Sequence, residues 1–175
     1  MVLIYIRHAR DDTRSALKTG TVNDAPLYDK SKGSCKNLGK KLLKKYGTPK
    51  KIFTSPFLRC KETVKYMLEG NNELITSNIS VEPDLRISKW FPTDQKFNPQ
   101  ITDKTQKYGV AITEDYEEFK KRVRQHCVSM KKYARSDNIY WCITHAIVFK
   151  KIHEYFFGDK GYDHVKSLEN FIVDE

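Results

Sequence analysis

Short apolar runs and longer amphipathic stretches alternate along the chain, and this pattern predicts strands separated by helices. The apolar runs are rich in β-branched and aromatic residues, which is typical of buried strands. Pro83 restricts the third run to a sheet edge, because proline cannot donate a hydrogen bond to a neighbouring strand. The predicted strands are residues 2–6, 51–54, 79–85, 139–143 and 171–173.

Between the apolar runs, hydrophobic residues recur at three- and four-residue spacing, as in amphipathic helices. Gly33 is expected to precede the first of these helices as a breaker. Ser55 and Pro56 are expected to begin the second, with serine as the N-cap and proline in the first turn. The predicted helices are residues 38–46, 56–68, 114–133 and 147–157, and the longest predicted loops are residues 11–32 and 91–113.

Strands that alternate with helices predict a three-layer α/β/α sandwich around a mostly parallel sheet. The chain of 175 residues is expected to form one domain, residues 1–175, with residues 91–113 as a lid loop. In such sheets, ligands bind beyond the carboxyl ends of the strands. The residues that directly follow each strand are therefore the first candidates for a functional site.

The composition is strongly basic, with 32 Lys and Arg against 22 Asp and Glu and a formal net charge of +10. This charge predicts an anionic partner: a phosphorylated ligand, a nucleic acid or an acidic surface. No apolar run approaches the ~20 residues of a membrane span, and the N-terminal run is too short for a signal peptide. The 4 cysteines form no C-x-x-C pair, which predicts packed, reduced thiols and a cytoplasmic location.

Two histidines and two arginines come just after predicted strands. Arg7 and His8 follow the first strand, Arg59 lies one turn into the helix after the second, and His145 follows residues 139–143. A neutral imidazole is a nucleophile toward phosphorus, and arginine matches the oxygens of phosphate. A second, protonated histidine would stabilise the charge on the transferring phosphoryl group. The four residues together predict phosphoryl chemistry.

The motifs around these residues resemble those of the histidine phosphatase superfamily, also called phosphoglycerate-mutase-like. The most specific motif is the S-P-x-x-R-x-x-x-T block of residues 55–63, and the resemblance covers most of the chain in the family's order. The other matching segments are Arg7-His8, Asp24-Ala25-Pro26-Leu27 with Gly33, and Thr144-His145-Ala146.

The resemblance implies a metal-independent, cofactor-free reaction on a phosphorylated substrate. It implies that His8 is the nucleophile that becomes phosphohistidine, and that Arg7, Arg59 and His145 form the rest of the phosphate pocket. The reaction implied has two steps: phosphoryl transfer to His8, then in-line attack by water. A general acid would protonate the leaving oxygen and then act as the base for water.

The chain departs from the family pattern around the nucleophile. Ala9 stands where the family has glycine, a change that is tolerated unless the backbone needs a positive φ. Arg10 and Arg14 make the rim of the pocket more positive, and they are candidates for substrate binding together with Ser55. A solvated Arg10 is the alternative interpretation.

The general acid is the larger departure. Many relatives carry a glutamate shortly after the third strand, where this chain has Ile87 or Ser88. Asp84 is the preferred candidate for the acid. The other candidates are Glu82, Asp11 and Asp12.

Several alternatives to a phosphatase stay open at this point. A mutase is less favoured, because mutases with this chemistry are usually longer and cover the site with insertions. The missing glutamate favours a phosphate-binding pseudoenzyme, and the lysine-rich residues 30–51 favour a module that binds nucleic acid or an acidic partner. Aromatic residues are not interleaved with those lysines, which argues against single-stranded nucleic acid.

Other classes of site are excluded by spacing. No cysteine is followed by arginine at C-x5-R spacing, and the chain has no G-x-x-x-x-G-K-[ST] loop. No cluster has the spacing of a metal site. His126, His153 and His164 are expected to be surface or capping residues.

Overall fold

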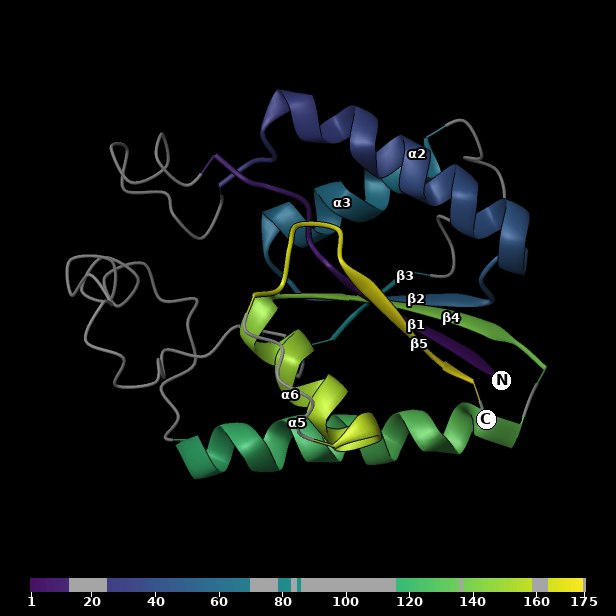
Figure 1. Ribbon diagram of the computed structural model, residues 1–175, viewed down its shortest axis with the longest axis vertical. Coiled ribbons are helices and arrows are strands. Elements are labelled where there is room, and N and C mark those ends of the chain that lie inside the picture. The colour runs from purple at the N-terminus through teal and green to yellow at the C-terminus, as the bar shows by residue number, and fades with distance from the viewer. Residues whose placement is uncertain are drawn as a thin grey trace.

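The computed structural model describes residues 1–12, 25–69, 79–82, 85, 116–135, 137–158 and 164–174. Five strands form one sheet in the order β3-β2-β4-β1-β5. Strand β5 is antiparallel to β1 and pairs Asp174 with Val2, whereas the other neighbours are parallel. Both ends of the chain therefore lie at the same end of the sheet (Figure 1). The strands are β1 (Val2–Arg7), β2 (Lys51–Thr54), β3 (Ile79–Val81), β4 (Ile139–Thr144) and β5 (Asn170–Asp174).

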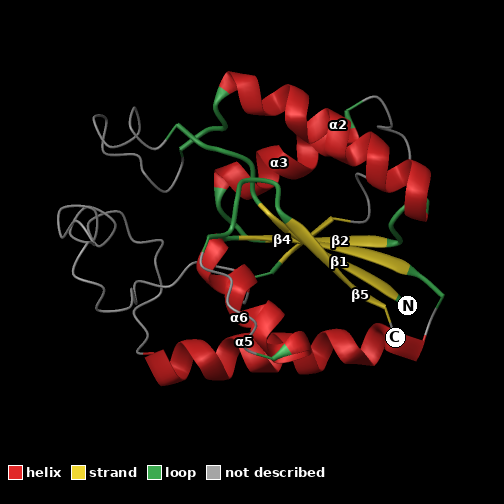
Figure 2. Cartoon of the chain, viewed as in Figure 1, coloured by secondary structure: helices red, strands yellow, loops and turns green. Residues whose placement is uncertain are grey.

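Two helices cover each face of the sheet, so the predicted three-layer α/β/α fold is confirmed (Figure 2). Helices α2 (Asp29–Tyr46) and α3 (Leu58–Leu68) pack on one face. Helices α5 (Tyr116–Lys131) and α6 (Ala146–Phe157) pack on the other, and a short 3-10 helix, Lys132–Arg135, follows α5. No helix within the described ranges combines the length and the apolar character needed to cross a membrane.

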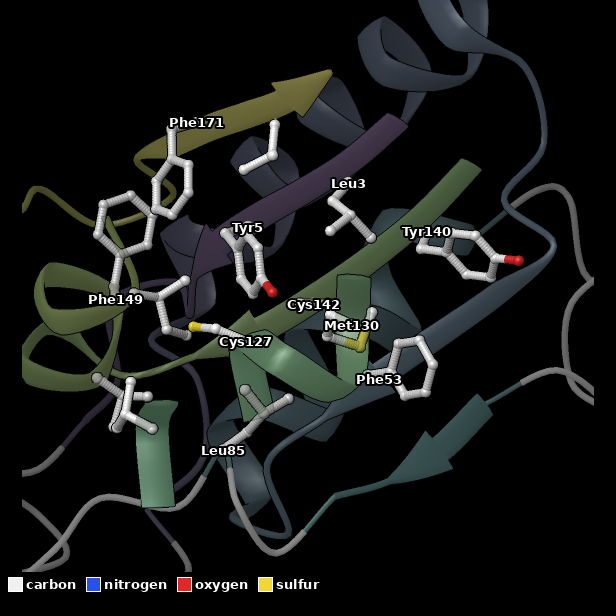
Figure 3. Packing of buried hydrophobic residues seen from close by; sticks show 14 of the residues in the cluster. Leu3, Tyr5, Phe53, Leu85, Cys127, Met130, Tyr140, Cys142, Phe149 and Phe171 are labelled. Carbon is white, nitrogen blue, oxygen red and sulfur yellow. The ribbon is translucent and has the colours of Figure 1, made fainter. Parts of the chain in front are cut away.

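The continuous apolar runs arise because the central strands are covered on both faces. Along β1, Leu3 and Tyr5 point toward α5 and α6, and Ile4 and Ile6 point toward α2 and α3. All four side chains have 0% exposure. Figure 3 shows the first of these clusters, in which side chains from the sheet meet those of α5 and α6, Cys127 among them. All four cysteines are buried free thiols.

The first helix begins earlier than the sequence predicts. Helix α2 starts at Asp29, after a turn in which the Ser31 N–H donates to the Tyr28 carbonyl at 2.8 Å, and it continues through Gly33. Gly33 as a breaker is therefore wrong. An exposed glycine weakens a helix by only about 1 kcal/mol relative to alanine, and the packing of the rest of α2 outweighs that loss.

Two further boundaries differ from the sequence prediction. Helix α3 begins at Leu58 with Phe57 at the N-cap position, and no side chain caps it, so Ser55 as the N-cap is wrong. Strand β3 ends at Val81 rather than at residue 85. The chain turns there, because the Leu85 N–H donates to the Glu82 carbonyl at 3.2 Å.

His126 lies in the core and not on the surface. It is 4% exposed on α5, and its Nε2 is 3.3 Å from the Tyr5 hydroxyl. Burial, and then the charge of Arg122, lower the pKa of His126 to about 4. The surface prediction failed because His126 occupies the buried stripe of α5 between Val123 and Met130, where histidine gives no apolar signal. His153 is half-buried and packs against Phe171, whereas His164 is exposed.

Candidate active site

The candidate site lies where the carboxyl ends of β1, β4 and β2 meet. These strands are neighbours, and the register pairs Arg7 with Thr144 and Thr54 with Ile143. The residues that follow the strands therefore converge. The rings of His8 and His145 have centroids 5.1 Å apart. Parallel pairing thus brings together histidines that are far apart in the sequence.

His8 is held with one defined ring nitrogen ready to react. Its Nδ1 is 2.6 Å from the carbonyl oxygen of Ala9. A carbonyl only accepts hydrogen bonds, so Nδ1 carries the proton and Nε2 keeps its lone pair. Burial, and then the charge of Arg59, lower the pKa of His8 from its ordinary value. The imidazole is therefore neutral and nucleophilic at physiological pH.

His145 is held between a hydroxyl and a guanidinium. Its Nδ1 lies 3.4 Å from a terminal nitrogen of Arg59, and its Nε2 lies 2.8 Å from the Ser55 Oγ. A guanidinium only donates, so Nδ1 accepts and the N–H of Nε2 donates to Ser55. Burial, and then Arg59, lower the pKa of His145 well below its ordinary value. The structure thus holds a neutral imidazole in place of the expected protonated one, because two arginines already supply positive charge.

Arg59 projects into the site from the first turn of α3 and is 7% exposed. Its Nε lies 3.3 Å from the Oδ2 of Asp11. Its guanidinium carbon lies 4.6 Å from the ring centre of Phe57, and that ring meets the His145 ring edge-on at 5.0 Å between centroids. Arg59 is therefore oriented before any ligand binds. Phe57 has no motif signature, and the sequence analysis missed it.

Arg7 is fixed by the segment that precedes β5. Its guanidinium donates to the carbonyl of Val165, and its backbone N–H donates to the carbonyl of Glu169 at 2.9 Å. Burial lowers the pKa of Arg7, but an arginine remains charged at neutral pH. The site therefore contains two oriented positive charges beside two neutral histidines.

The spacing of the S-P-x-x-R-x-x-x-T block places its threonine one helical turn after its arginine. Thr63 lies one turn after Arg59, donates to the Arg59 carbonyl at 2.7 Å and accepts from the Ala9 N–H at 3.0 Å. Glu62 accepts from the Leu27 N–H at 2.6 Å. Helix α3 thus holds two segments of the site in place: the residues just after His8, through Ala9, and the segment around Leu27. Both residues belong to the quoted block, but only the structure shows what they hold.

The substitution of Ala9 for glycine is accommodated without strain. Leu168 is the one non-glycine residue in the described part of the chain with a positive φ, so Ala9 has an ordinary backbone conformation. The alanine side chain is fully buried.

The remaining predicted site residues have no observed contact with the two histidines, or lie outside the described residues. Arg10 is exposed, and its guanidinium carbon lies 5.8 Å from the ring centre of Tyr28. Glu82 accepts from the Ser80 hydroxyl at 2.8 Å. Arg14, Asp84 and the lid loop 91–113 lie outside the described residues.

Comparison with known proteins identifies the class of protein that this site belongs to. The sequence profile of the histidine phosphatase superfamily (branch 1) matches residues 3–170. The chain belongs to this superfamily. No curated protein matches the chain significantly.

Solved structures with the same fold include both mutases and phosphatases. A phosphoglycerate mutase from Bacillus anthracis str. Sterne superposes with a TM-score of 0.70 at 17% identity, over 99% of this chain and 88% of that one. Ecdysone phosphate phosphatase from Bombix mori, in complex with tungstate, gives 0.66 at 19% identity, over 98% and 88%. The protein histidine phosphatase SixA, complexed with tungstate, gives 0.64 at 12% identity, over 96% and 84%. At these identities the likeness establishes the fold and not the substrate.

Proposed function

We propose that this protein is a metal-independent phosphatase that hydrolyses a phosphomonoester or a phospho-amino acid through phosphohistidine on His8. The tautomer of His8 is the main support for this proposal. The Nδ1 of His8 donates to a backbone carbonyl, so the lone pair of Nε2 is available beside Arg7 and Arg59. A buried neutral imidazole among arginines is suited to attack on phosphorus.

The proposed reaction uses each polar side chain of the site. Arg7 and Arg59 bind the non-bridging oxygens of the phosphoryl group, and the Nδ1 of His145 accepts from the Arg59 guanidinium and so helps to orient it. The Nε2 of His8 attacks phosphorus and the alcohol leaves. Water then attacks phosphohistidine and releases phosphate. Ser55 is fully buried, and its hydroxyl orients His145.

The substrate is proposed as a class and not as a compound. The names of the structural neighbours include a phosphoglycerate mutase, an ecdysone phosphate phosphatase and a protein histidine phosphatase, all of which concern phosphorylated compounds. The net charge of +10 supports an anionic substrate. Four buried free thiols support a reducing, cytoplasmic compartment for the reaction.

The proposal is tested by phosphate release from p-nitrophenyl phosphate with EDTA present. We expect turnover without added metal, inhibition by vanadate or tungstate, and a phosphorylated peptide containing His8 after rapid quenching and mass spectrometry. The adduct should be acid-labile, as phosphoramidates are. Binding of vanadate without any turnover would overturn the proposal in favour of a pseudoenzyme. Turnover that requires a divalent metal would overturn the mechanism.

We expect the Arg59→Ala variant to bind vanadate about 10- to 100-fold more weakly than the wild type, since a charge-assisted hydrogen bond contributes about 1.5–3 kcal/mol. The change also leaves Asp11 without this partner beside the incoming anion. Titration of vanadate inhibition measures the effect. The matched control is Lys61→Ala, which removes the same charge from an exposed position of α3. Equal losses in both variants would show that only long-range charge matters.

A further inference from the structure

The sequence leaves the proton-transfer residue open among four carboxylates, and the structure separates those that it describes. Glu82 accepts a hydrogen bond from Ser80 of the neighbouring strand β3. Asp12 lines a surface hollow with Pro26, Tyr28 and Lys30. Asp11, by contrast, contacts Arg59 of the phosphate pocket. Among the described candidates, Asp11 therefore has an observed contact with an arginine of the phosphate pocket.

The backbone around Asp11 is fixed by pairing with a second segment. Asp11 forms a β-bridge with Leu27, and the Asp12 N–H donates to the Pro26 carbonyl at 2.9 Å. Side chains alternate along a paired segment, so Asp11 and its neighbour Asp12 point to opposite sides. The position of Asp11 beside the pocket is thus built into the fold through Leu27, which Glu62 holds in turn.

The Asp11 carboxylate is partly exposed to solvent beside the buried Arg59. Its side chain is 17% exposed, whereas that of its partner Arg59 is 9% exposed. The charge of Asp11 raises the pKa of His8 and of Arg7, against the larger lowering effect of burial on each. Asp11 is therefore near the nucleophile as well as near Arg59. A partly exposed carboxyl beside the nucleophile can meet both a leaving group and incoming water.

We propose that Asp11 is the general acid and base of the reaction, donating a proton to the leaving oxygen and then accepting one from the attacking water. This inference rests on the proposed function, and it assigns to Asp11 the role that the sequence analysis preferred for Asp84.

Asp11 gives up one proton in the first step of the proposed reaction and regains one in the second. In the first step, a bond forms between Nε2 of His8 and phosphorus, and the bond from phosphorus to the ester oxygen breaks. The electron pair goes to that oxygen, which takes the proton of the Asp11 carboxyl and leaves as an alcohol. In the second step, water forms a bond to phosphorus and gives a proton to the Asp11 carboxylate. The electron pair of the P–N bond returns to Nε2, and inorganic phosphate is released.

The Arg59 ion pair explains how a carboxylate takes up the required proton. A phosphate ester brings oxygens that compete with Asp11 for the guanidinium of Arg59. Two negative groups beside each other repel, and protonation of Asp11 relieves that repulsion. A proton held between the bound ester and Asp11 is then the one that the leaving oxygen takes.

The test is the Asp11→Asn variant, assayed with two esters that differ in leaving group. Asparagine keeps the shape of the side chain but cannot transfer the proton. With p-nitrophenyl phosphate, whose leaving group needs no acid, we expect a nitrophenolate burst at close to the wild-type rate. Steady-state turnover should then be about 100-fold or more slower, because the second step lacks its base. With phenyl phosphate, we expect the first step itself to slow by about 100-fold and no burst to appear.

The controls separate this inference from the proposed function. Asp29→Asn removes the same charge from an exposed position of α2 and should behave as the wild type. Wild-type kinetics of Asp11→Asn with both esters, or tighter vanadate binding as its one effect, would overturn the inference while the His8 mechanism stands. The described burst pattern in Asp84→Asn instead of Asp11→Asn would overturn it in favour of Asp84. A wild-type protein without phosphorylation of His8 would remove the proposed function and this inference together.

Discussion

The His8→Asn variant should lose at least about 1,000-fold in turnover of p-nitrophenyl phosphate and retain the fold. The variant lacks the Nε2 lone pair, so phosphohistidine cannot form, and the remaining groups of the pocket can only bind the ester. The asparagine amide can still donate to the Ala9 carbonyl, which His8 reaches at 2.6 Å, so the local structure should persist. Phosphate release with EDTA present measures activity, and circular dichroism verifies the fold.

The control for this prediction is His164→Asn, because His164 is an exposed histidine in the segment before β5. It should keep wild-type activity. Vanadate should still bind to His8→Asn, since Arg7 and Arg59 are intact. Release of phosphate by His8→Asn at a rate close to that of the wild type would refute the phosphohistidine mechanism.

The Gly39→Ala variant should be less stable than the wild type by about 3 kcal/mol, because the alanine methyl group meets backbone that cannot move aside. A Cβ added at Gly39 would lie 1.9 Å from the carbonyl oxygen of Met67 on α3. Helices α2 and α3 would have to separate. Because α3 carries Arg59 and Thr63, activity should fall together with stability. Urea unfolding followed by circular dichroism measures the free energy of unfolding.

Gly33→Ala is the matched control, since Gly33 lies in the same helix and a Cβ there would meet nothing within 4 Å. Alanine is the better helix former, so this variant should gain about 0.5–1 kcal/mol. Equal stability changes in the two glycine variants would show that close packing of α2 on α3 does not depend on Gly39.

Much of the fold could be predicted from the sequence because its signals are local. The central strands are continuous apolar runs, since both faces of the sheet are covered, and β4 differs from its prediction only by including Thr144. The limits of α2 and β3 were less predictable. A glycine inside a packed helix and a turn held by the Glu82 carbonyl depend on neighbours that a short window does not contain.

The candidate site shows the same division. The S-P-x-x-R-x-x-x-T block and the histidines after strands are readable along the chain. The role of Ser55 could not be predicted from the sequence. A serine before a proline is typical of an N-cap, yet its hydroxyl meets His145, 90 positions away in the sequence. Likewise, the burial of His126 depends on a contact with Tyr5 of β1, which is distant in the sequence.

Consecutive residues are enough to predict the alternation of strands and helices, because hydrophobic periodicity is a local feature. The same holds for the basic charge and for the two histidines and two arginines that follow strands. The chemistry that these residues can perform depends on the folded chain. The proton of His8 sits on Nδ1 because a carbonyl faces it, and both histidines are neutral because burial and Arg59 disfavour a second charge. Asp11 meets Arg59 because pairing with Leu27 places it there. Protonation and contact depend on groups brought together in space, and parallel strand pairing supplies those groups from distant parts of the chain.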